Sequence, residues 1–324
     1  MKILLTTTSY QDTPGKHHEV LAQSKLEVVR ARGPLPEEAM LDLIKSNGGF
    51  DGLLNGDDLI TAKVIDAALA APTKLKVIAK YGIGLDSIDV KHATEQKLPV
   101  LYTPGVNHTT VAEHAFGLII GIAKHFWPHL RSVKKGEWKR ITGSELAGKT
   151  IGVIGMGRIG KEVIIRAAAF DMKPIAFDVY WDGAFAWKHK VERAQSAEDV
   201  LKRADVISLH MNLDDANRGF INKDRIAMMK KGAVLINTAR GGLVVEKDIA
   251  EACKSGQLGG YGTDVLDHEP IKPPHPFMDV DNILVTPHVA SRTFESVERQ
   301  AMRATLNIVN FLNGDKDYIQ ANQF

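Results

Sequence analysis

Four side chains that can bind a metal or move a proton lie within six positions of one another, in the segment TDVLDHEP (263–270). They are Asp264, Asp267, His268 and Glu269. Carboxylates and imidazoles at this spacing suit a metal centre or a pair of acid–base catalysts. They also suit an ordinary polar loop after a strand. The choice depends on which other chemically active residues the fold brings to this segment.

A glycine-rich turn is the clearest binding motif in the chain. Gly155, Gly157 and Gly160 have the spacing G-x-G-x-x-G, after a β-branched strand pattern and before a helical one. Such glycines permit a tight turn and a close approach of a pyrophosphate, which sits on the amides that open the helix, here those of Arg158 and Ile159. The turn therefore predicts a dinucleotide site, with a purely structural turn as the alternative.

The identity of the dinucleotide follows from the next strand, which ends at Asp178, 18 positions after Gly160. A carboxylate at this place accepts hydrogen bonds from the ribose hydroxyls of adenosine. It also repels a 2′-phosphate, and no Arg or Lys follows directly in DVYWDG (178–183). We expect NAD rather than NADP.

Several later strands end in ionisable residues. In chain order they are His210, Arg240, the segment 263–270 and His288. Ligands of doubly wound folds bind beyond the carboxyl ends of the strands. There Arg240 can grip a carboxylate with two hydrogen bonds, and His288 can take a hydroxyl proton while a hydride leaves. A carboxylate beside His288 would orient its ring, but the residues alone do not say which one.

Strand and helix patterns alternate along almost the whole chain, which predicts parallel sheets built from βαβ units and hence an α/β fold. A first series of strands precedes a long amphipathic stretch (108–126), and a second series follows it. We expect two doubly wound parallel-sheet domains and a last helix over 293–314. The strand candidates are 2–7, 52–55, 76–80 and 99–102, then 150–155, 173–178, 205–210, 233–239, 259–265 and 282–287.

The composition excludes several classes of partner. The chain has 324 residues, 44% hydrophobic and 25% charged, with a net charge of +2 and no long basic block, so neither nucleic acid nor an anionic membrane is expected. Its longest apolar stretch is interrupted before the roughly 18 residues that a membrane span needs. The single Cys253 suits a reducing compartment, and we expect a cytoplasmic protein.

These motifs, in this order, resemble the D-isomer-specific 2-hydroxyacid dehydrogenases, and the likeness covers nearly the whole chain. The segments that carry it are YGIGLDSID, TPGVNHTTVAEHAFGLII, GKTIGVIGMGRIG, KKGAVLINTARGGLV, DVLDHEP and VTPHVAS. Several spaced motifs are far more specific than a glycine turn alone.

The resemblance implies a role for each matching residue. Arg240, Glu269 and His288 would be catalytic, with Glu269 as the partner of His288. Asp264 would face the nicotinamide side of the cofactor. Further contacts to NAD would come from Thr110, His210, Thr238 and Ala239. The substrate carboxylate would bind Arg240 and the backbone of the loop formed by Tyr81, Gly82, Ile83 and Gly84.

Family architecture implies a discontinuous substrate domain of flavodoxin type, residues 1–103 and 291–324. A Rossmann NAD-binding domain, residues 104–290, would be inserted into it, with the active site in the cleft and closure excluding water. A homodimer built around the helical region before the glycine turn is also implied. Two departures from the family pattern, Asn212 in place of a proline and Val179 after the ribose acid, bear on adenine packing.

The substrate is a small 2-hydroxy or 2-keto acid whose identity stays open. The segment 131–140 is similar to that of phosphoglycerate dehydrogenases, and Lys80 and Arg140 are suited to hold a phosphate. The chain stops at Phe324, without the regulatory domain that many of those enzymes carry. Reduction of hydroxypyruvate or glyoxylate is therefore the alternative.

Two further classes of function compete with a dehydrogenase. An NAD-sensing regulatory protein of the same fold would keep Arg240, Glu269 and His288. A metal-dependent hydrolase would use the acidic and histidine residues of 263–270. Since NAD makes a metal unnecessary for hydride transfer, we expect no metal, with His268 idle and Glu269 acting on His288.

Overall fold

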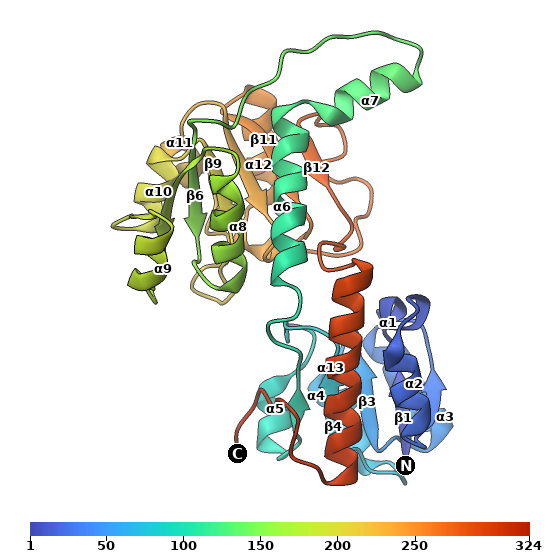
Figure 1. Cartoon of the computed structure of the whole chain (residues 1–324). Coiled ribbons are helices and arrows are strands. Elements are labelled where there is room, and N and C mark those ends of the chain that lie inside the picture. Colours follow the sequence, from blue (N-terminus) through green and yellow to red (C-terminus); the bar gives the residue numbers. More distant parts are fainter. The chain divides into compact units, whose positions relative to one another are not determined.

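Two separate parallel sheets form the framework of the chain in this computed structural model, which describes residues 1–324 (Figure 1). Unit 1 comprises Met1–Asn107 and Arg292–Phe324, and unit 2 comprises His108–Ser291. The sequence analysis placed the boundaries after residues 103 and 290. The predicted fold class, an α/β chain with two doubly wound parallel sheets, is confirmed.

Unit 1 has the strand order β2-β1-β3-β4-β5, which is that of flavodoxin-like folds. All residues of the central strands β3 and β4 are buried, as expected for a sheet that helices cover on both faces. The strands are β1 (Lys2–Leu5), β2 (Glu27–Arg30), β3 (Gly52–Asn55), β4 (Val77–Lys80) and β5 (Val100–Leu101).

Two groups of helices supply those covers. One core cluster joins the sheet to α3 (Glu37–Asn47), α4 (Ala62–Ala70) and α5 (Val90–Glu95). The other joins it to α1 (Thr8–Asp12), α2 (Lys16–Gln23) and the last helix, α13 (Phe294–Asn313). Residues 292–324 thus complete the core of the domain that the first residues begin. The sequence analysis recognised α13 but neither α1, α2 nor β2.

Unit 2 has the strand order β12-β11-β10-β9-β6-β7-β8, the Rossmann arrangement. The chain starts in the middle at β6, builds outward through β7 and β8, and then crosses back to β9. Neighbouring β6 and β9 therefore form the switch point, where ligands bind beyond the carboxyl ends. The strands are β6 (Thr150–Ile154), β7 (Lys173–Phe177), β8 (Glu192–Arg193), β9 (Val206–Leu209), β10 (Ala233–Asn237), β11 (Leu258–Thr263) and β12 (Ile283–Val285).

The helices of unit 2 also divide between the two faces. One face packs on α6 (His108–Ala123) and α8 (Arg158–Ala168). The other packs on α10 (Ala197–Arg203), α11 (Lys223–Met228) and α12 (Glu246–Ser255), while α9 (Gly183–Lys188) follows β7. No helix of the chain is both long and apolar enough for a membrane span.

The amphipathic stretch 108–126 divides between two helices. The helix α6 ends at Ala123, and a second helix, α7 (Phe126–Lys134), starts at a new angle (Figure 1). His125 between them has φ +52°, a left-handed conformation that no helix can continue through. An exposed segment then leads from α7 to β6.

Candidate active site

The three predicted catalytic residues follow three neighbouring strands of unit 2. Arg240 follows β10, Glu269 follows β11 and His288 follows β12. These strands are paired in parallel, so their carboxyl ends lie at one edge of the sheet. The topology therefore brings a guanidinium, a carboxylate and an imidazole to the same edge.

His288 and Glu269 form a hydrogen-bonded pair. The distance from His288 Nδ1 to Glu269 Oε2 is 2.8 Å. The other carboxylate oxygen, Oε1, accepts the amide of Leu266 at 2.9 Å, which fixes the orientation of the carboxylate. Both side chains keep contact with solvent, at 44% and 37% exposure. An imidazole held this way is oriented for proton exchange and its positive form is stabilised.

Asp264 is almost completely buried and holds the loop that carries His288. Its Oδ1 accepts the hydroxyl of Thr286 at 2.6 Å and the amide of Val289 at 2.9 Å, and its Oδ2 accepts the amide of Ala290 at 2.7 Å. Between these contacts, His288 has φ +53°. This left-handed conformation is uncommon for a non-glycine residue.

The other two residues of the opening cluster do not join this pair. Asp267 forms an ion pair with Arg218 at 2.9 Å. The side chain of His268 is 97% exposed. No three His, Cys, Asp or Glu side chains of the chain lie close enough together to hold a metal ion. The four residues therefore differ in their surroundings. Asp264 holds the loop of His288, Asp267 forms a surface ion pair, His268 is exposed, and Glu269 is bonded to His288.

The turn that carries Arg240 is braced by Asn237, a fully buried residue that sequence reasoning missed. Its amide nitrogen donates to the carbonyl of Arg240 at 2.9 Å, and its side-chain oxygen accepts the amide of Ala239 at 3.1 Å. Gly241 comes next. A Cβ at this position would lie 1.9 Å from the carbonyl carbon of Leu266, so the Arg240 turn packs directly on the loop that leads to Glu269.

The glycine-rich turn has the geometry that a dinucleotide needs. Gly155 has φ +97°, and a Cβ there would lie 2.6 Å from the backbone of His210. A Cβ on Gly160 would lie 2.1 Å from the carbonyl oxygen of Gly155, so α8 packs closely on the turn. Nothing lies within 4 Å of a Cβ built on Gly157, which leaves room where a pyrophosphate binds. Arg158 and Ile159 open α8 directly after it.

Asp178 lies beside this turn. Its Oδ2 accepts the amide of Met156 at 2.5 Å, and its Oδ1 accepts the amide of Tyr180 at 2.7 Å. The carboxylate is therefore fixed at the end of β7, next to the turn that starts α8. This is the place from which an acidic side chain reaches the adenosine ribose.

Two buried polar atoms near the carboxyl edge lack a partner within the protein, His210 Nδ1 and Thr238 Oγ1. Such atoms are rare in native structures unless a ligand or water satisfies them. Burial lowers the pKa of His210 to about 3, so its ring is neutral at physiological pH. Both residues were predicted to contact NAD. The open space at Gly157, the fixed Asp178 and these two atoms fit that cofactor.

Thr110 and Ala239, also predicted to contact NAD, have protein partners. The hydroxyl of Thr110 donates to the carbonyl of Ala290 at 3.3 Å. The carbonyl of Ala239 accepts Nη1 of Arg240 at 2.7 Å. Their contacts to the cofactor, like that of Asp264, stay predictions.

The predicted substrate-binding residues lie in different parts of the chain. Lys80 ends β4 in unit 1 and its ammonium group is buried, where it donates to the Asp57 carboxylate at 2.7 Å and to the Gly56 carbonyl. The loop 81–84 follows it, with the Gly82 amide bonded to Thr103 Oγ1 at 3.0 Å. Arg140 lies in the exposed segment of unit 2 between α7 and β6.

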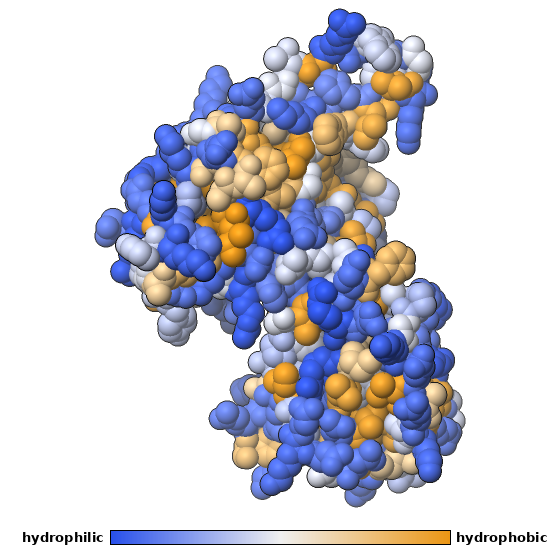
Figure 2. Space-filling view, viewed as in Figure 1, coloured by the Kyte–Doolittle hydropathy of each residue, from blue (hydrophilic) through white to orange (hydrophobic).

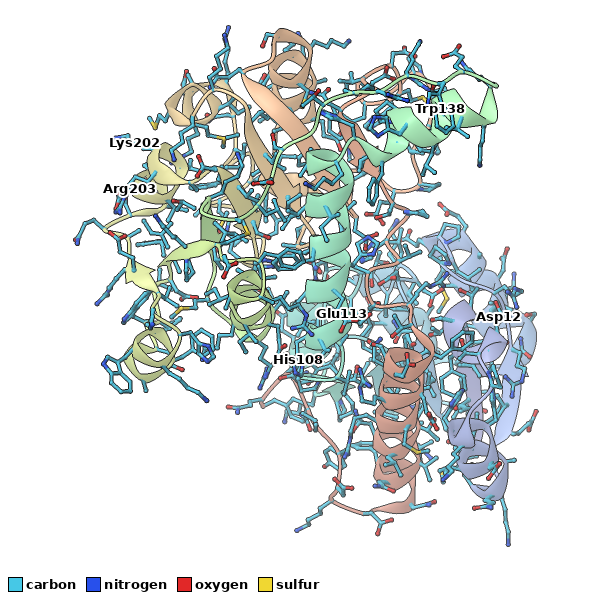
Figure 3. All side chains as sticks on the ribbon, turned by 45° about the horizontal axis from the view of Figure 1, so that its top comes forward. Asp12, His108, Glu113, Trp138, Lys202 and Arg203 are labelled. Atoms are coloured by element: carbon cyan, nitrogen blue, oxygen red, sulfur yellow. The ribbon has the colours of Figure 1, made fainter.

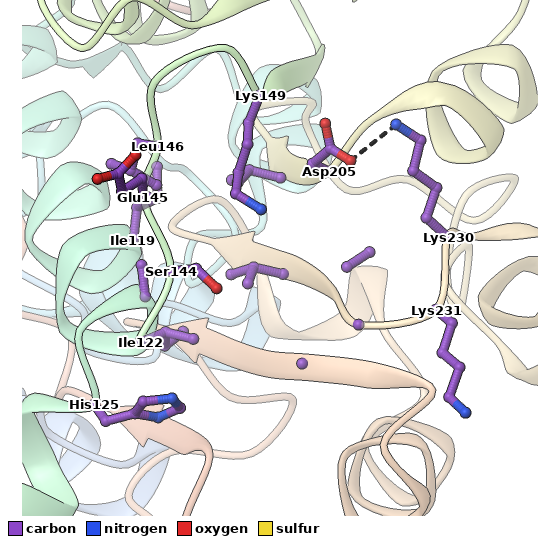
Figure 4. A pocket seen from close by; sticks show the side chains of 16 residues that line it. Ile119, Ile122, His125, Ser144, Glu145, Leu146, Lys149, Asp205, Lys230 and Lys231 are labelled. Carbon is purple, nitrogen blue, oxygen red and sulfur yellow. Dashed lines mark hydrogen bonds and ion pairs between the residues drawn. The ribbon is translucent and has the colours of Figure 1, made fainter. Parts of the chain in front are cut away.

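A cavity of about 250 Å³ lies elsewhere in unit 2 (Figure 4). It is lined by the end of α6 and by residues at the amino ends of β9 and β10, where Lys230 forms an ion pair with Asp205 at 2.8 Å. Arg240, Glu269 and His288 lie at the carboxyl ends of the strands. The cavity is therefore separate from the candidate active site.

Comparisons with known proteins show which family the chain is similar to. Residues 116–290 match the family model described as "D-isomer specific 2-hydroxyacid dehydrogenase, NAD binding domain". The chain is 37% identical to a D-3-phosphoglycerate dehydrogenase of Methanocaldococcus jannaschii over 97% of its own length and 58% of that protein. It is 36% identical to a glyoxylate reductase of Thermofilum pendens, over 87% and 83% of the two chains.

Solved structures superpose on nearly the whole chain. A protein from Thermus thermophilus superposes with a TM-score of 0.89 at 35% identity, covering 99% of this chain and 100% of that one. A glyoxylate reductase from Paecilomyes thermophila superposes with a TM-score of 0.84 at 27% identity, covering 99% and 98%. The similarity thus extends over both units.

Proposed function

The chain belongs to the D-isomer specific 2-hydroxyacid dehydrogenase family, and from this premise we propose that Arg240, Glu269 and His288 interconvert a 2-hydroxy acid and a 2-keto acid. The observation that carries the proposal is the 2.8 Å bond between His288 and Glu269, at the sheet edge where Arg240 also lies. NAD, when bound, supplies the chemistry of a hydride acceptor or donor.

His288 is the acid–base group in this proposal. Its Nδ1 is bonded to Glu269, so we assign proton exchange with the substrate oxygen to Nε2. In the direction of reduction the imidazolium donates a proton to the carbonyl oxygen, and in the direction of oxidation the neutral ring removes one from the hydroxyl. Glu269 stabilises the imidazolium and keeps the ring in one orientation.

Arg240 binds the carboxylate of the substrate. A guanidinium forms two parallel hydrogen bonds with a carboxylate and stays charged at any working pH. The buried Asn237 and the tight contact at Gly241 hold its backbone in place. Binding of this kind fixes the orientation of the carbon that exchanges the hydride.

We further propose that the preferred substrate is a short, unphosphorylated 2-keto acid such as glyoxylate or hydroxypyruvate. The ammonium of Lys80, one of the two cations suited to a phosphate, is buried and bonded to Asp57. The second candidate is 3-phosphohydroxypyruvate. It is favoured by the exposed Arg140 and by the similarity to phosphoglycerate dehydrogenases.

Consumption of NADH with glyoxylate, hydroxypyruvate and 3-phosphohydroxypyruvate tests both candidates. The first predicts a higher kcat/KM for the unphosphorylated acids, unchanged in Arg140→Ala. The second predicts that Arg140→Ala selectively raises KM for the phosphorylated acid. A protein that binds NAD but reduces none of the acids would instead be a regulatory NAD sensor.

The chain also presents an apolar arm, defined as α7 and the following residues up to Ile141, which we propose binds a second copy of the chain. Its exposed apolar side chains recur at helical spacing and continue beyond the helix. They are Phe126, Trp127, Leu130, Val133, Trp138 and Ile141, with 40–76% exposure, and apolar side chains of the arm are visible in Figure 2. Trp138 is the most exposed of them and lies beyond the end of α7 (Figure 3).

Exposed apolar side chains gathered in one segment mark an interaction surface. A homodimer is the partner that we expect, because symmetric pairs are the commonest soluble assemblies. Sedimentation of the protein should give twice the mass of the chain, and Leu130→Asp with Val133→Asp should give the single mass. A wild-type protein that sediments as a monomer at micromolar concentration would contradict the dimer.

A further inference from the structure

The loop that carries His288 contacts the helix α6 through His114, a residue to which no role has been assigned. His114, on α6, places its Nε2 2.8 Å from the hydroxyl oxygen of Thr286. That hydroxyl lies 2.6 Å from Asp264 Oδ1, which in turn accepts the amide of Val289. A continuous path of hydrogen bonds therefore runs from α6 to the residue next to His288.

A second contact joins the same helix to the same loop. The hydroxyl of Thr110, one helical turn before His114, donates to the carbonyl of Ala290 at 3.3 Å. Residues four apart lie on one face of a helix. The face of α6 that bears Thr110 and His114 thus contacts the loop at both of its ends, at Thr286 and at Ala290.

The direction of each bond in this path follows from the chemistry of its groups. Asp264, as a carboxylate, only accepts hydrogen bonds, so the single hydroxyl proton of Thr286 points to it at 2.6 Å rather than to the carbonyl of Thr263 at 3.4 Å. The oxygen of Thr286 must then accept from His114, and Nε2 of His114 must carry a proton. His114 Nε2 also lies 3.6 Å from Asp264 Oδ1, close enough to moderate the buried negative charge.

We propose that His114 is a positioning residue, which holds the His288 loop in its working conformation through Thr286 and Asp264. The proposal rests on the proposed function, because it gives the loop a catalytic purpose. His288 keeps a left-handed backbone that is unfavourable for a residue with a side chain, so the contacts of Asp264 must offset that preference. Without the His114 donor, Thr286 loses one hydrogen bond, and the hydrogen bonds through which Asp264 holds the loop become weaker.

The test compares His114→Phe, which removes the donor, with His114→Gln, whose terminal amide can donate from a similar place. Hydrogen exchange of the Val289 and Ala290 amides should speed up in the Phe variant and return towards the wild-type rate in the Gln variant. The kcat of the Phe variant should fall about 2- to 10-fold, the size expected for one hydrogen bond, with KM for NAD unchanged.

Glu113→Gln provides the matched control. Glu113 is the neighbouring residue on α6, but it forms an ion pair with Arg166 of α8 at 3.2 Å and has no contact with the loop (Figure 3). This variant should keep the wild-type exchange rates and kcat. If His114→Phe also keeps them, or if His114→Gln is no better than His114→Phe, the positioning role is wrong.

A measurement on the unmodified protein keeps the proposal testable if the Phe variant does not fold. Nitrogen-15 NMR of the histidine rings should show a proton on Nε2 of His114, and an unprotonated Nε2 would overturn the inferred path. The exchange and NMR results do not depend on the reaction. If His288→Ala keeps normal turnover, the proposed function fails while the hydrogen-bonded path can still stand.

Discussion

Unit 1 and unit 2 each contain a buried aspartate with three hydrogen-bond donors of the same two kinds. Asp58 accepts one threonine hydroxyl and two backbone amides, and so does Asp264. Their side chains are equally hidden, in residues with 0% and 2% exposure. The chemistry of the two carboxylates is the same, but the origin of their donors differs.

The donors to Asp58 come from three places in unit 1: Thr6 after β1, Leu35 before α3 and Gly56 after β3. The donors to Asp264 all lie in one loop of five residues, 286–290. A carboxylate that joins distant segments stabilises a domain, whereas one that holds a single loop controls the side chain in that loop. We therefore expect the sequence range of the donors, rather than the type of contact, to separate the structural role of Asp58 from a functional role of Asp264.

The strongest test of this distinction removes the side chain that the Asp264 loop carries. His288→Ala should lower kcat by about 10²- to 10⁴-fold, the usual contribution of an acid–base group. Melting temperature and NAD affinity should change little, because the His288 side chain is 44% exposed. Steady-state kinetics and a thermal melt measure both. His268→Ala, at a side chain 97% exposed, is the control and should behave as wild type.

The second test exchanges the same carboxylate for an amide in each unit. Asp264→Asn should reduce kcat by about 10- to 100-fold with a small change in melting temperature, as expected for hydrogen bonds to a charged group. Asp58→Asn should lower the melting temperature by several degrees and leave kcat per folded molecule near its wild-type value. Equal losses of stability in the two variants would remove the distinction between the clamps.

A smaller effect is expected at the accessible carboxylate of unit 2. Asp178 accepts two amides and is only partly buried, so it retains the capacity to bind a ligand. Asp178→Ala should weaken NAD binding about 10-fold and reduce the discrimination against NADP, since the repulsion of a 2′-phosphate is lost. Titration with both cofactors measures this. An unchanged preference would show that Asp178 belongs with the structural clamps.

The smallest effect concerns the core of unit 1. Burial raises the pKa of Tyr10 to about 12 from its ordinary value of 10. The folded state therefore favours the neutral phenol, and the resulting stabilisation is present below pH 10 and is lost as the pH rises towards 12. Tyr10→Phe should make the melting temperature fall less between pH 10 and pH 12. Equal slopes for the two proteins over this range would contradict the assignment.

Sequence patterns predicted the parts of the site that depend on local spacing. The glycine turn with Asp178 and the strand-end positions of Arg240, Glu269 and His288 follow from residue types at fixed distances along the chain. The bond between His288 and Glu269 followed only from family resemblance, because several carboxylates lay equally near in sequence. Asn237 and His114 were missed, since their contacts depend on how a turn or a distant loop folds back. The break at His125 depends on a left-handed backbone conformation that the amphipathic pattern of 108–126 does not specify.

Lys80 is a second example of a contact that local sequence patterns do not reveal. A cation before a glycine loop is typical of a ligand-binding lysine, and nothing in the spacing reveals the partner that the structure provides. Asp57 lies 23 positions earlier, two residues after the neighbouring strand β3, and the parallel pairing of β3 and β4 brings it to the ammonium. The parallel register, which local patterns do not specify, determines this contact.

The contact at Gly241 has a consequence for any attempt to redesign the enzyme. Because a single added carbon would collide with the backbone of Leu266, the turn after Arg240 and the loop that leads to Glu269 can pack this closely only with a glycine at position 241. Variation at position 241 should therefore be excluded from a mutant library from the start.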